Sequence, residues 1–169
     1  NSLNTIYLAL IAAFLCSSIA LIINFSGRIQ RNKFFGFLSS SLSLGYGLPG
    51  IILAIGIMQL FIFLDNNIIF LNFVFTGSIL GLLIAYVIKA YALANTSIES
   101  GYIRVSPYME DIAKTLTASN FKILFQVHLP LLKTSFLTSA LLVISEVIKE
   151  LPATLILRPF NFDTLAVST

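Results

Sequence analysis

The sequence predicts an all-α polytopic membrane protein. Of its 169 residues, 57% are hydrophobic and 10% are charged, whereas soluble domains carry roughly a quarter charged residues. Charges are absent from three long runs, 1–27, 34–64 and 66–88. Each run exceeds the roughly 20 apolar residues with which a helix crosses a ~30 Å hydrocarbon layer. A soluble core of this size does not bury three such runs, so we expect them to span a membrane.

Four spans are expected, at about 5–25, 42–64, 68–88 and 131–151. The second contains Gly45-Tyr-Gly-Leu-Pro-Gly50, and such a run of glycine and proline breaks or loosens a helix. A broken helix survives in a membrane only where protein or a water-lined cavity satisfies the freed backbone groups. The third span carries Gly77-x-x-x-Gly81, a spacing that lets helices approach closely.

Basic residues alternate between the loops. Three lie in the loop 28–33, the next loop holds only Asp65, and five lie in the segment 89–133. Because cytoplasmic loops of membrane proteins are enriched in lysine and arginine, both basic segments are expected on the cytoplasmic side of the membrane. This alternation accounts for the net charge of +3. No basic patch with interleaved aromatic residues remains, so membrane lipid is an expected partner and nucleic acid is not.

The chain ends favour an excerpt from a longer protein. The chain starts at Asn1, and its first apolar run lacks the basic flank and cleavage site of a signal peptide. No expected span follows the final stretch 165–169. Cys16 is the single cysteine and lies within an apolar span, so no disulfide framework is expected.

The segment 104–130, between the last two spans, predicts two short amphipathic helices. Ser106-Pro107 is a favourable start for the first, with serine as cap and proline in the first turn. Glu110 and Lys114 lie on its polar faces and are spaced to pair. One apolar face follows at i, i+3, i+4 and i+7, formed by Met109, Ile112, Ala113 and Leu116.

The second amphipathic helix is expected to begin after Ser119 and to stop at Leu129-Pro130, just before the fourth span. Paired amphipathic helices of this kind either lie in the lipid interface or dock into a groove on a soluble partner. The residue pattern leaves both possibilities open.

The segment from Asp111 to Pro130 resembles the EAA loop of binding-protein-dependent ABC permeases. That pattern reads E-A-A-x-x-x-G and, ten residues beyond the glycine, I-x-L-P. Asp111 stands at its acidic position and Thr117 at its glycine, and the close is Val127-x-Leu129-Pro130. The threonine is the largest departure, because glycine permits a close approach that a β-branched residue does not.

The stretch 149–166, from Lys149-Glu-Leu-Pro to Asp-Thr-Leu-Ala166, is similar to the second half of ferric-iron ABC permeases, and the break at 45–50 resembles the corresponding break in that family. The likeness covers about 42–166 and implies most of one permease transmembrane domain with a cytoplasmic coupling helix. It also implies a cytoplasmic ABC ATPase that binds ATP and Mg²⁺, a periplasmic substrate-binding protein, and ferric iron as solute, with thiamine, sulfate or polyamines as near alternatives. The implied contacts with the ATPase are Met109, Glu110, Asp111, Ile112, Ala113, Leu116, Thr117 and Ala118.

The sequence contains no catalytic apparatus. It lacks the Gly-x-x-x-x-Gly-Lys-Ser/Thr run that cradles ATP phosphates. His128 is the single histidine, and we expect it to be structural rather than a metal ligand or catalytic base. The chain is therefore expected to be a transport subunit without an enzyme site, a metal site or a cofactor of its own.

Charged residues of the fourth span are the other functional candidates. Glu146 lies roughly 20 Å along that span, where a charge costs at least ~2.5 kcal/mol unless it faces protein or water. We expect Lys149 or Arg158 to neutralise it, with Glu150 on the same helix face. The four residues form either a salt-linked helix end or a polar lining of the translocation pathway, whose carboxylates suit hard cations.

Two rival functions remain open. An ion-coupled secondary transporter could move protons or cations through Glu146 and Glu150. A membrane scaffold without transport activity would explain the spans but not the buried charges.

Overall fold

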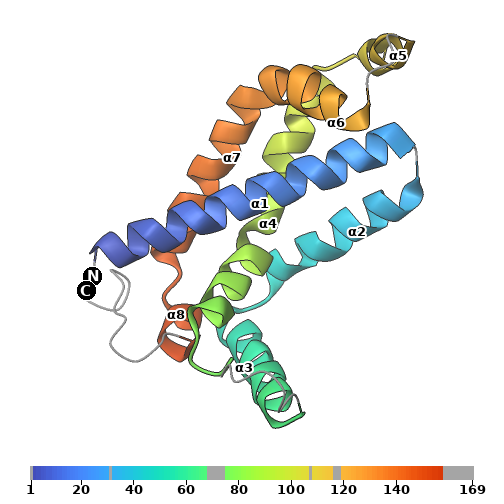
Figure 1. The fold of residues 1–169 in the computed structure, drawn as a ribbon. Helices are drawn as coiled ribbons and strands as arrows, with labels where there is room; N and C mark the ends of the chain where they lie inside the picture. Colours follow the sequence, from blue (N-terminus) through green and yellow to red (C-terminus); the bar gives the residue numbers. More distant parts are fainter. Residues whose placement is uncertain (1, 31, 68–74, 107, 116–118, 158–169) are drawn as a thin grey trace.

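The computed structural model describes residues 2–30, 32–67, 75–106, 108–115 and 119–157 (Figure 1). Within these ranges every element is helical. In chain order they are α1 (Ser2–Gln30), α2 (Lys33–Ser43), the 3₁₀ turn η1 (Leu44–Gly47), α3 (Gly50–Asn67), α4 (Ile79–Ile103), α5 (Tyr108–Thr115), α6 (Asn120–Ile123), the π-helical η2 (Leu124–His128), α7 (Leu129–Lys149) and α8 (Pro152–Leu157).

Four helical stretches are long and apolar enough to cross a membrane, which confirms the expected all-helical chain with four candidate membrane spans in its described part. They are Asn4–Gln30, Gly50–Asn67, Ile79–Ile103 and Asn120–Lys149. The expected end of the third span at residue 88 lies inside α4, which continues to Ile103. Lys89 follows the apolar run within this helix and forms an ion pair with the buried Glu150. The expected start of that span, 68–74, lies outside the described residues.

The core is formed by α1, α4 and α7, which make the most extensive contacts in the described part of the chain (Figure 1). Small side chains let their backbones approach closely. A Cβ added to Gly101 of α4 would collide with Ser135 of α7. Ser17 and Ser139 form a buried hydrogen bond of 2.5 Å between α1 and α7. The small buried residues of α1 include Ala9, Ala12, Ala13, Cys16 and Ala20.

The second span is broken, as the glycines predict, but into two helices rather than one bent span over 42–64. The chain leaves α2 through η1 and begins α3 at Gly50. A Cβ on Gly45 would lie 2.5 Å from the carbonyl oxygen of Ile88 in α4, so a side chain there has no space. The expected Gly77-x-x-x-Gly81 packing motif is wrong, because Gly77 precedes α4 in a turn with φ of +79°.

The helix that begins after Ser119 does not stop at Pro130. The Ser119 side chain accepts a hydrogen bond from the Lys122 backbone, as expected of a cap. The helix then widens into the π turn η2, where the Leu129 N–H bonds to the Leu124 carbonyl. Pro130 falls within the first turn of α7. A π turn changes the local hydrogen-bond register, so proline, which lacks an N–H, does not end the helix.

Candidate functional site

The helix α5 stands apart from the membrane helices, near the end of the bundle at which α1 and α4 finish (Figure 1). We call this the basic end, because Arg28, Lys33 and Arg104 lie there. Two side chains of α5 are buried, those of Glu110 and Ala113.

The predicted apolar face of α5 is partly buried and partly exposed. Ala113 is buried against the protein, whereas Met109 and Ile112 are 43% and 60% exposed, beside Tyr108 at 76%. Asp111 is also exposed. The outward surface of α5 is therefore a mixed apolar and acidic patch. Three of the expected contact residues, Leu116, Thr117 and Ala118, lie outside the described residues.

The surroundings of Glu110 differ most from those that the sequence predicts. Its expected pair with Lys114 on a solvated face is replaced by a buried ion pair with Arg28, with Nε and Oε1 2.5 Å apart. His128 Nε2 lies 3.6 Å from the same carboxylate oxygen. A carboxylate that is 6% exposed requires such partners because an unpaired buried charge is costly. The pair connects α5 to the last turn of α1.

Arg28 also holds the end of α4. Its Nη1 donates to the Tyr102 carbonyl at 2.8 Å and its Nη2 donates to the Val105 carbonyl at 2.6 Å. The Tyr102 carbonyl belongs to the last turn of α4 and the Val105 carbonyl follows the helix, so the guanidinium binds the chain where α4 ends. One arginine thus joins α1, α4 and α5, and its cation lies 5.2 Å from the centre of the Tyr102 ring.

His128 is fully buried in η2. Its ring meets Phe25 edge-on, with centroids 5.0 Å apart, and lies 5.4 Å from the Tyr102 ring. The histidine therefore packs where α1, α4 and η2 meet, beside the Arg28–Glu110 pair. The structural role expected for it stays a prediction.

A second buried ion pair lies at the break in the second span. Lys89 of α4 donates to Glu150, which ends α7. The Glu150 carboxylate lies against the start of α3, where a Cβ on Gly50 would collide with Oε1. A helix N-terminus favours a negative charge. The start of α3, just after the break, thus lies beside an ion pair formed between α4 and the end of α7.

The structure describes three of the four charged residues expected to lie together at the end of the fourth span. Lys149 is exposed and Glu150 is buried, because the chain leaves α7 at Glu150 and the two side chains no longer share a helix face. Arg158 lies outside the described residues. Glu146 is half-buried and shares a small cleft with Lys89. The sequence did not predict Lys89 as the partner of Glu150, because it placed this lysine in the basic segment 89–133.

Compared with known protein families and with curated proteins, the chain matches none. Within the described residues, no cluster of three or more histidine, cysteine, aspartate or glutamate side chains could hold a metal ion. The two ion pairs and the exposed surface of α5 are therefore the features from which a function can be argued.

Proposed function

We propose that the chain is a membrane-spanning permease subunit of an ATP-driven ABC importer. The observation that carries the proposal is which side chains of α5 are exposed and which are buried. Tyr108, Met109 and Ile112 are exposed on its outer side, while Glu110 on its inner side is ion-paired to α1. A protein bound to the outer side could therefore move the membrane helices through a direct contact.

The same construction favours a protein partner over a lipid surface. A helix that lies on lipid buries its apolar face in the membrane, whereas α5 turns Ala113 and Glu110 inward and exposes apolar residues next to Asp111. Tyr and Met are enriched in protein interfaces, whose rims are polar. The likeness of 111–130 to the EAA loop identifies a cytoplasmic ABC ATPase, carrying ATP and Mg²⁺, as the expected partner.

The remaining parts of the proposal rest on the resemblance. A periplasmic substrate-binding protein would deliver the solute at the end of the bundle that holds Asp65, and the membrane would be a bacterial-type inner membrane. Ferric iron is the first candidate solute, and thiamine, sulfate and polyamines are the alternatives. Coupling requires that ATP binding stabilise one conformation of the spans over another.

The test is co-purification of the ATPase with Ile112→Arg. The exposed position allows the new side chain without disturbing the fold, whereas Ala113 is buried and Ala113→Arg would damage α5 itself. An unpaired charge at a packed interface costs several kcal/mol, so ATPase recovery should fall by at least about tenfold. The matched control is Ile103→Arg, because Ile103 is 83% exposed but lies outside α5. Equal recovery with Ile112→Arg and the unmodified chain would place α5 on the lipid surface.

A secondary transporter is the second candidate, and the Lys89–Glu150 pair favours it. Broken helices beside intramembrane charges are typical of ion-coupled carriers, and Glu146 lies in the same cleft. Uptake that persists without any ATPase but stops when the proton gradient is collapsed would support this candidate over the ABC importer.

A further inference from the structure

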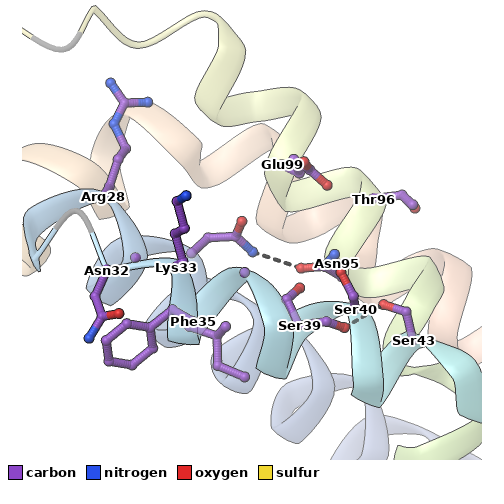
Figure 2. Close-up of a pocket in the computed structure, with 14 residues that line it drawn as sticks. Arg28, Asn32, Lys33, Phe35, Ser39, Ser40, Ser43, Asn95, Thr96 and Glu99 are labelled. Atoms are coloured by element: carbon purple, nitrogen blue, oxygen red, sulfur yellow. Dashed lines mark hydrogen bonds between the residues drawn. The ribbon is translucent and has the colours of Figure 1, made fainter.

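A polar cavity lies between α1, α2 and α4 (Figure 2). Its volume is about 700 Å³. Figure 2 shows the serines of α2 facing Asn95 of α4 across it. Its polar lining includes Asn24, Asn32, Ser39, Ser40, Ser43, Asn95 and Thr96. Polar side chains inside a membrane domain face water or other polar groups, because lipid offers them no hydrogen bonds.

Asn95 lies in the wall of this cavity, and its side-chain N–H group donates no hydrogen bond within the described residues. The residue is 7% exposed. Its Oδ1 accepts from Asn24 Nδ2 at 2.8 Å, drawn as a dashed line in Figure 2, and from the Tyr91 hydroxyl at 3.4 Å. Among the described residues, its Nδ2 has no hydrogen-bond partner. Because polar groups inside proteins are nearly always hydrogen-bonded, this amide is free to donate to water or to a solute in the cavity.

Among the described residues, the charges of the lining balance once Arg28 is counted with its partner Glu110. The nitrogens of Arg28 are already bonded to Glu110 and to two backbone carbonyls. Figure 2 shows this side chain turned away from the serines. The remaining charges are Lys33 from α2 and Glu99 from α4, which oppose each other. The cavity therefore offers neutral donors and acceptors with one charge of each sign.

The cavity ends where the second span breaks. Beyond Ser43, Gly45 packs against the backbone of Ile88, and the next residue of α4 is Lys89, paired with Glu150. The polar lining along α2 thus leads from the basic end to the buried ion pair, and a close backbone contact separates the two.

We propose that this cavity is the cytoplasmic vestibule of the solute path and that it takes a small polar solute without net charge. The proposal rests on the transport function proposed above and narrows its solute. A neutral hydroxyl- or amide-bearing molecule, a zwitterion or a neutral metal complex fits the lining, and a bare Fe³⁺ ion does not.

The test is the reaction of single cysteines with charged thiol reagents in inside-out membrane vesicles. Ser40→Cys and Ser43→Cys are made with Cys16→Ser, and Phe37→Cys is the control because Phe37 lies on α2 but is 72% exposed and does not line the cavity. The probes are a cationic and an anionic methanethiosulfonate of similar size. Both serine positions should react. The control should not, because we expect its exposed apolar position to face lipid, where a thiol does not ionise. After correction for the reaction with free thiol, the two rates should agree within about threefold, whereas a cleft lined by one sign of charge favours its counter-ion by roughly tenfold or more.

A further variant tests whether Asn95 faces the cavity. Asn95→Asp keeps the shape of the side chain and adds a negative charge, so reaction at Ser43→Cys should shift toward the cationic reagent by at least about threefold. Absence of reaction at both serine positions, or equal reaction at Phe37→Cys, would overturn the vestibule. A tenfold preference for either reagent without Asn95→Asp would overturn the assignment of an uncharged solute. These reactions require no ATPase, so they fail or succeed independently of the co-purification test.

Discussion

The two buried ion pairs have the same chemistry but different surroundings. Arg28–Glu110 lies at the basic end and shares its cation with two backbone carbonyls. Lys89–Glu150 lies near the middle of α4 and meets the N-terminus of α3. The first attaches a peripheral helix to the bundle, and the second holds three membrane helices together. We therefore expect the first to control coupling and the second to control folding.

Breaking the central pair should have the largest effect. Lys89→Met leaves Glu150 buried without its cation, and Glu150→Gln leaves Lys89 without its anion. Removing one partner of a buried pair costs about 3–5 kcal/mol, so each variant should accumulate poorly and unfold at a lower temperature in detergent.

The double variant Lys89→Met with Glu150→Gln should cost less than the sum of the two single changes, because it leaves no unpaired charge. Additive losses would show that the two residues act independently, and the comparison between the two pairs would then fail.

The next largest loss of stability is expected at the break in the second span. Gly45→Ala would place a methyl group 2.5 Å from the Ile88 carbonyl oxygen, and overpacking of this kind costs about 1–3 kcal/mol. The matched control is Gly47→Ala in the same turn, where no atom lies within 4 Å of the added Cβ. Thermal unfolding should separate the two variants, and equal unfolding temperatures would contradict the close contact between η1 and α4.

Loss of the peripheral pair should be local. Glu110→Gln removes the charge that holds α5 but leaves the core of α1, α4 and α7 intact. The unfolding temperature of the bundle should change little, while amide hydrogen exchange over 108–115 should rise at least tenfold, because a segment with few buried contacts opens on its own. A large fall in global stability would show that both pairs serve the same structural purpose.

The smallest effect is expected at Lys149. This residue is exposed, so Lys149→Gln should change stability by less than about 0.5 kcal/mol. A loss comparable to that of Lys89→Met would restore the pairing expected from the sequence, in which Lys149 neutralises Glu146. Thermal unfolding of the two lysine variants side by side decides the matter.

Local patterns in the sequence predicted much of the fold. Runs without charge located the spans, the glycines located the break, and Ser119 located a helix start. The failures involve distant partners. Lys89 pairs with Glu150, 61 residues away in sequence, and periodicity can place Glu110 on a face of α5 but cannot say that Arg28 covers that face. The polar cavity was missed for the same reason, since its serines and Asn95 come from different helices.

The contact between α5 and an ATPase is the central claim, and cross-linking tests it most directly. A photoreactive maleimide is attached to Ile112→Cys in the Cys16→Ser chain, co-expressed with the candidate ATPase and irradiated in membranes. The account predicts a cross-linked band that contains the ATPase, and none from the control Phe37→Cys, which is also exposed but lies on α2. Equal cross-linking at both positions, or reaction of Ile112→Cys with lipid alone, would contradict it.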